Sequence, residues 1–215
     1  MPNRAPIPPA SADAPSAEGR VYAAAARATE FFMREADVHR ALEKVTRLLA
    51  DDGIPYALVG ALALGEYGYE RVTVDVDLLL TSEGLRLFKA KHLGRGYLEK
   101  FAGSKGMRDT ETGVAIDVLL AGEYPGDGLP KPVVFPDPAL VAVHTEGLRL
   151  LPLPLLLELK LASGMSAPHR LKDLADVLEL IRAAQLPFDL SEKLNPWVQA
   201  KYQELWQAAQ SGNDE

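Results

Sequence analysis

Two aspartates one residue apart, Asp75 and Asp77, interrupt an otherwise apolar and β-branched stretch at residues 72–80. Side chains alternate along a strand, so both carboxylates point to the same face. Two like charges this close are destabilising in an apolar element unless a cation or a proton separates them. Magnesium suits the position, because it is held by one or two carboxylates together with phosphate oxygens. The stretch therefore predicts a magnesium site that works on a phosphate-bearing substrate.

A seat for phosphate is predicted just before this strand. Residues 57–59 read as a short strand that ends at Gly60, and Ala61 then opens a helix. Both residues have almost no side chain, so backbone N–H groups at the helix start could approach a phosphate closely.

A third carboxylate, Asp117, lies in the middle of another buried-looking strand at residues 114–120. Such an aspartate is rarely left unpaired. If the two strands are neighbours, three carboxylates converge and could hold two metal ions about 3.5–4 Å apart. That arrangement stabilises the attacking and leaving oxygens of an in-line displacement.

In type, order and spacing, Gly60-Ala61, Asp75-x-Asp77 and Asp117 resemble the DNA polymerase beta-like nucleotidyltransferase superfamily. The resemblance implies an α/β fold with a small mixed sheet, N-terminal helices and a C-terminal helical bundle. It also implies magnesium-dependent transfer of a nucleotidyl group from a nucleoside triphosphate to an acceptor hydroxyl. The chain departs from the pattern at Ala61, where the superfamily often has a serine whose hydroxyl can touch a phosphate.

The finer pattern Arg71-x-Thr73-x-Asp75-x-Asp77 looks like the bacterial branch that includes AbiEii-type abortive-infection toxins. Arg71 is expected either to contact phosphate or to pair with Glu70 or Asp75. Thr73 is expected to orient the Asp75 carboxylate or to serve only as a β-former.

The same branch carries a helical lysine and a downstream Arg-x-x-Asp, which Lys160, Arg170 and Asp173 match. The resemblance implies that Lys160 reaches the triphosphate while Arg170 and Asp173 order the neighbouring helix. From the residues alone, Lys160 is equally an ordinary surface lysine. The alternative for Asp173 and Asp176 is a solvated acidic face, with Arg170 and Asp173 as an i,i+3 pair. Leu180 falls in the same column of the helix, which argues against a fully solvated face.

Composition narrows the class of protein. The 215 residues include no cysteine, which excludes disulfides and thiolate sites. Neither an apolar run of membrane-spanning length nor a signal peptide is evident, so a cytoplasmic protein is expected. The net charge of −7 argues against a constitutive nucleic-acid binder. Between residues 86 and 108, however, seven Lys or Arg residues face only Glu99. This segment could attract a nucleotide or an RNA end, or it could be the solvated side of a helix.

Three domains of the chain are expected. Residues 1–20, rich in Pro, Ala and Ser, are predicted to be a disordered tail. Residues 21–151 alternate helix and strand and form the catalytic core, and residues 152–215 form helices packed on it. A long Gly- and Pro-rich connection at residues 122–138 is expected beside the active site.

Two functions remain open at this stage. In the first, Asp75 and Asp77 hold magnesium on the triphosphate and Asp117 completes the second site and activates the acceptor, which is an RNA end, a protein or a small molecule. In the second, the fold is a non-catalytic binding module that acts through a partner protein, as in a toxin–antitoxin pair.

Overall fold

The computed structural model describes residues 17–145 and 147–211, with side chains from residue 33 onward. The chain divides into two compact units, Met1–Arg34 and Glu35–Glu215. Most of the predicted tail lies outside the described residues, but residues 17–20 already belong to a helix. From Glu35 on, the predicted core and the predicted C-terminal helices share one unit.

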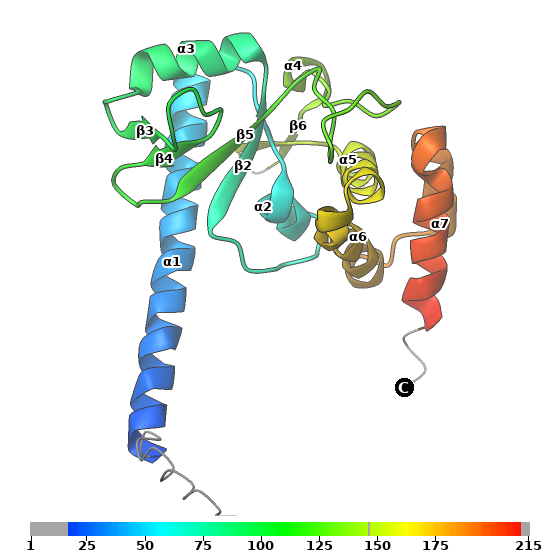
Figure 1. Ribbon diagram of the computed structural model, residues 1–215, viewed down its shortest axis with the longest axis horizontal. Coiled ribbons are helices and arrows are strands. Elements are labelled where there is room, and N and C mark those ends of the chain that lie inside the picture. Colours follow the sequence, from blue (N-terminus) through cyan, green and yellow to red (C-terminus); the bar gives the residue numbers. More distant parts are fainter. Residues whose placement is uncertain (1–16, 146, 212–215) are drawn as a thin grey trace, which may run out of the picture. The chain divides into compact units, whose positions relative to one another are not determined.

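The described residues form one seven-stranded mixed sheet in the order β3-β4-β5-β2-β1-β7-β6, which confirms the expected α/β class (Figure 1). The strands are β1 (Ala57–Leu58), β2 (Asp75–Leu80), β3 (Tyr97–Glu99), β4 (Met107–Asp109), β5 (Ala115–Leu120), β6 (Val143–Thr145) and β7 (Leu148–Leu150). Two neighbouring pairs, β2 with β5 and β1 with β7, are parallel, and the other pairs are antiparallel.

Helices precede, connect and follow the strands. They are α1 (Ala17–Asp51), α2 (Gly60–Glu66), α3 (Ser82–His92), α4 (Pro138–Val141), α5 (Leu153–Ser166), α6 (Leu171–Ala183) and α7 (Pro196–Ser211), with the 3-10 turns η1 (Pro168–Arg170) and η2 (Phe188–Lys193). Along residues 17–145 and 147–211, no helix is both long and apolar enough to cross a membrane.

Strands β2 and β5 position the predicted carboxylates. Val76 and Ile116 are fully buried on the core side of these strands. Asp75, Asp77 and Asp117 alternate with them and are only partly buried. The period-two reading of both strands is therefore confirmed, although β2 begins three residues later than the predicted strand at residue 72.

Two local features differ from what the sequence suggests. Ser82 is the cap that the sequence suggests for α3, but the cap is Thr81, because the Thr81 hydroxyl accepts a hydrogen bond from the backbone N–H of Gly84 at 3.0 Å. The short helix suggested near residues 138–144 ends at Val141, and residues 143–145 form strand β6 instead. Its three residues are exposed and pair only with β7, so they lack the apolar alternation that identifies a buried strand.

Helices α5 and α6 pack closely through a glycine. A Cβ on Gly164 would lie 2.4 Å from Cγ of Leu174, so the helices cannot keep their spacing with any larger residue. Most of the second half of α5 is buried, including Leu161 and Ala162 at 0% exposure. The contact between these helices sets where the side chains of both helices meet the sheet.

We therefore expect Gly164→Ala to lower the free energy of unfolding by about 1–3 kcal/mol, since the added methyl group forces α6 away. Gly65→Ala in α2 is the matched control, because its nearest neighbour would be Cγ of Glu70 at 3.9 Å. Urea unfolding should show the control unchanged or slightly stabilised, as alanine favours helix. Equal effects of the two substitutions would contradict the close packing.

Candidate active site

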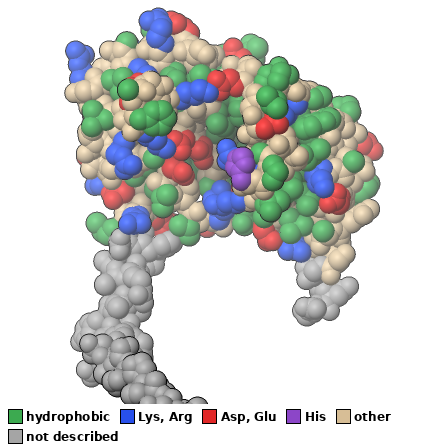
Figure 2. Space-filling view, viewed as in Figure 1, with side chains coloured by type: hydrophobic (Ala, Val, Ile, Leu, Met, Phe, Trp, Pro, Cys, Tyr) green, Lys and Arg blue, Asp and Glu red, His purple; other side chains and the backbone are tan. Residues whose placement is uncertain are grey.

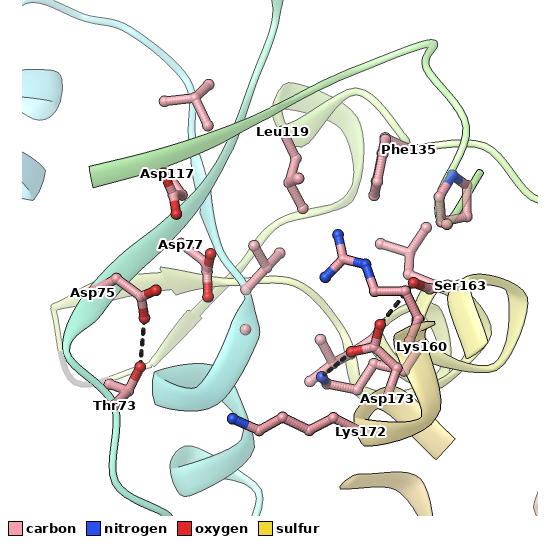
Figure 3. A pocket seen from close by; sticks show the side chains of 18 of the residues that line it. Thr73, Asp75, Asp77, Asp117, Leu119, Phe135, Lys160, Ser163, Lys172 and Asp173 are labelled. Atoms are coloured by element: carbon pink, nitrogen blue, oxygen red, sulfur yellow. Dashed lines mark hydrogen bonds and ion pairs between the residues drawn. The ribbon is translucent and has the colours of Figure 1, made fainter. Parts of the chain in front are cut away.

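The three predicted carboxylates share one face of the sheet. In the parallel pairing of β2 with β5, Asp77 is the register partner of Asp117, and Asp75 is two residues earlier on the same face. In Figure 3 all three point into one cavity. The two strands are neighbours, which is the condition on which the convergence of the three carboxylates depended.

Asp77 lies at the most crowded point of this group. Its pKa is raised to about 6, first by burial and then by the charges of Asp75 and Asp117, against the opposing charges of Lys160 and Arg71. The first residue of α2 lies against the same carboxylate. Gly60 has a φ of +66°, and a Cβ there would lie 1.9 Å from Oδ2 of Asp77, so only glycine fits.

The two other carboxylates each have a partner of their own. The Thr73 hydroxyl donates to Oδ1 of Asp75 at 2.5 Å, as expected for a residue that orients this carboxylate. The ammonium group of Lys100 contacts Oδ1 of Asp117. Lys100 was not predicted as a site residue.

The residues fit a magnesium ion held by two carboxylates. In the described parts of the chain, no three His, Asp or Glu side chains form a group that could hold a metal ion. Asp75 and Asp77 nevertheless supply hard oxygen ligands. Burial, and after it the charges of Asp75 and Asp117, raises the pKa of Asp77, and a cation would offset both effects. The expected three-carboxylate metal centre stays a prediction.

The opposite wall contains a buried charge network on α5 and α6. Lys160 is only 7% exposed, and its ammonium donates to Asp176 at 2.7 Å and to Asp173 at 3.1 Å. The Ser163 hydroxyl donates to the other oxygen of Asp173 at 2.6 Å. The alternative that Asp176 belongs to a solvated acidic face is therefore wrong, because Asp176 is 2% exposed. Asp173 pairs with Lys160 and not with Arg170.

Arg71 joins the connection before β2 to this network. Its Nε lies 2.9 Å from Oδ1 of Asp176, so the expected partners Glu70 and Asp75 are replaced by a residue on α6. No sequence pattern points to this partner, which is 105 positions away.

Three cationic or ionisable side chains at the cavity are exposed and unpaired. Arg170, Lys172 and His169 line it, and none of them makes a side-chain ion pair or hydrogen bond within residues 33–145 and 147–211. Figure 3 shows Lys172 extending from α6 into the cavity. In Figure 2 acidic side chains gather on one side of a hollow, with a histidine and basic side chains on the other. Lys172 and His169 were missed, since nothing in their spacing marked them.

The cavity between these walls has a volume of about 640 Å³. The predicted loop contributes Pro125, Gly126 and Phe135 to it, as expected. Ala61 is buried in α2 and does not line the cavity, so its proposed phosphate contact stays a prediction. The remaining lining is mostly apolar and includes Val59, Val72, Val74, Val118, Leu119, Leu156 and Leu159.

The basic segment at residues 86–108 is not a free cationic surface. Five of its seven cations pair with carboxylates: Arg86 with Glu83, Lys89 with Glu99, Lys91 with Asp52, Lys100 with Asp117 and Lys105 with Glu123. Arg108 donates to a backbone carbonyl. Most of the acids come from outside the segment, which is why the sequence count overstated its charge.

Comparison with known proteins gives only distant similarities. No family model matches the chain, and the comparison with curated proteins found no match. Among solved structures, that of ANT(2'')-Ia in complex with adenylyl-2''-tobramycin is 14% identical with a TM-score of 0.47, and covers 80% of this chain and 97% of that one. The solution structure of ANT(2'')-Ia is 12% identical with a TM-score of 0.43, covering 80% and 91%. An H. pylori protein described as a nucleotidyltransferase is 17% identical with a TM-score of 0.47, covering 82% and 93%.

The buried network predicts a structural role for Lys160. Lys160→Met should lower the free energy of unfolding by about 3–5 kcal/mol, because Asp176 and Asp173 would lose the cation between them. Lys172→Met, which removes an unpaired and exposed lysine, should change stability by no more than about 0.5 kcal/mol. Urea unfolding of both variants checks the difference, and a Lys160→Met variant as stable as Lys172→Met would contradict it.

Proposed function

We propose that this protein transfers a nucleotidyl group from a nucleoside triphosphate to an acceptor hydroxyl. The observation that carries the proposal is one cavity with two unlike walls. Asp75, Asp77 and Asp117 form an acidic wall, and the unpaired Arg170 and Lys172 lie on the other side. Carboxylates suit a magnesium ion and free cations suit phosphate oxygens, so together they suit a magnesium–triphosphate substrate.

Each residue has a role that its position supports. Asp75 and Asp77 would hold magnesium, which when bound offsets phosphate charge and aligns the reacting oxygens. Thr73 keeps the Asp75 carboxylate oriented. Gly60 leaves the room that the Asp77 carboxylate needs. Arg71 and Lys160 hold the opposite wall through Asp176, and Arg170 and Lys172 neutralise the phosphates.

The proposed reaction exchanges one bond to the α-phosphorus for another. The acceptor hydroxyl oxygen forms a bond to the α-phosphorus, and its proton passes to the carboxylate of Asp117. The bond from the α-phosphorus to the bridging oxygen breaks, and pyrophosphate leaves with the electron pair. Arg170 and Lys172 are placed to stabilise that developing charge.

The acceptor and the biological setting are finer parts of the proposal. An RNA end, a protein hydroxyl and a small molecule each present the required oxygen. A toxin or antitoxin partner, and the reading as a non-catalytic module, stay predictions, and the unpaired cations favour a nucleotide ligand in either case.

The first test is the melting temperature with each nucleoside triphosphate, with and without magnesium. At saturating nucleotide we expect a magnesium-dependent rise of about 5–10 °C for the preferred base. The double variant Asp75→Asn/Asp77→Asn should lose this rise. Asp51→Asn, on the exposed end of α1, is the matched control and should keep it. No rise with any nucleotide in the wild type would refute the proposal.

Transfer itself is tested with the nucleotide that gives the rise, labelled at the α-phosphate, and separate RNA, protein and small-molecule fractions. Label should enter one fraction with the wild type and none with Asp77→Asn. Binding without transfer to any fraction would leave the non-catalytic module as the better description.

A separate prediction concerns Lys172. Lys172→Met should weaken nucleotide binding roughly ten-fold, since one charge-assisted contact to phosphate is lost. Lys193→Met removes an exposed lysine that does not line the cavity, and should bind like the wild type. Titration calorimetry gives both affinities. Equal affinities would remove Lys172 from the phosphate site.

A further inference from the structure

Lys100 places a positive charge on the third carboxylate of the site. It directly follows β3, and its ammonium contacts Oδ1 of Asp117 on β5. The two side chains are 30% and 38% exposed, so the pair is reachable from solvent. Asp117 lines the cavity and Lys100 does not. Asp117 therefore already has a cation where a two-metal centre would need the carboxylate for a metal ion.

The loop that carries Lys100 is held in place by α3. The Glu99 carboxylate accepts from Lys89 Nζ at 2.7 Å and from the backbone N–H of Gly103 at 3.0 Å. Lys89 also contacts the carbonyl oxygen of Ser104, which is buried. Because both sides of the loop are tied to one lysine of α3, the backbone at Lys100 has little freedom to move away from β5.

Gly106 shows that the fold reserves space for this pair. A Cβ at Gly106 would lie 2.9 Å from Oδ1 of Asp117 and 3.2 Å from Cδ of Lys100. Gly106 does not have a positive φ, so its backbone conformation does not require glycine. Its missing side chain is needed because the two paired side chains occupy that volume.

We propose that the Lys100 ammonium takes the place of a second divalent cation, so that the centre binds one divalent ion, on Asp75 and Asp77. A divalent ion and an ammonium group on the same carboxylate oxygen would repel each other strongly. This inference rests on the proposed function, because it assumes the magnesium site on β2. It makes Lys100 a positioning residue that keeps Asp117 facing the acceptor.

The test counts bound Mn²⁺ ions per chain by electron paramagnetic resonance, with no nucleotide present. The wild type should bind one ion and Lys100→Met two, and the second ion should broaden the signal through coupling between close Mn²⁺ ions. Lys105→Met is the matched control, since it removes a lysine from the same loop that pairs with Glu123 and not with Asp117. It should bind one ion, and so should Lys100→Arg, which keeps the charge.

Asp117→Asn provides a second route that does not depend on Lys100→Met folding. If the ion is held by Asp75 and Asp77, this variant keeps one Mn²⁺. Two ions in the wild type, one in a folded Lys100→Met, or loss of the ion in Asp117→Asn would each overturn the inference while the proposed function stands. If the wild type binds no Mn²⁺, the proposed metal site fails and the inference fails with it.

Discussion

The parallel pairing of β2 with β5 creates the constraint on which the rest of the site depends. It places Asp77 beside Asp117 in a sheet whose other face is fully apolar at these positions. Like charges on neighbouring strands are unfavourable. They add to the effect of burial, which is the larger cause of the raised pKa of Asp77. Neighbouring side chains reduce this repulsion at two of the three carboxylates. Thr73 donates a hydrogen bond to Asp75, and Lys100 forms an ion pair with Asp117. Among the described residues, the Asp77 carboxylate has no such hydrogen-bond or ion-pair partner, so a bound cation would have its largest effect there.

The charges on the far wall are arranged differently. Lys160, Arg71, Asp173 and Asp176 neutralise one another inside α5, α6 and the connection before β2. Such a network adds little net stability, but removing one member leaves a buried charge without a partner. It also fixes the connection that carries Thr73, because Arg71 is attached to α6. Among the cavity-lining cations of the described residues, Arg170 and Lys172 have no side-chain partner and are available to a ligand.

Close approaches at glycines set the dimensions of the cavity. Gly60 admits the Asp77 carboxylate, Gly106 admits the Lys100–Asp117 pair and Gly164 brings α6 against α5. Gly126, with a φ of +76°, lets the loop at residues 122–137 pack on α5, where a Cβ would lie 2.2 Å from Oγ of Ser166. Each of these positions brings two elements of the chain into close contact, so the site and the core packing are built from the same contacts.

The sequence by itself determined the local features of this protein. Period-two alternation put Asp75 and Asp77 on one face of their strand, and the small residue Gly60 indicated a turn at the start of α2. These follow from backbone geometry, which acts over a few residues. That Asp117 shares this face was decided by the pairing of β2 with β5. Only the tertiary structure decided the partners of the charges. Lys100 with Asp117 and Arg71 with Asp176 are 17 and 105 positions apart, and Lys160 proved to be buried between two acids and not at the surface. Charge pairing has no sequence period, because it depends on which elements the fold brings together.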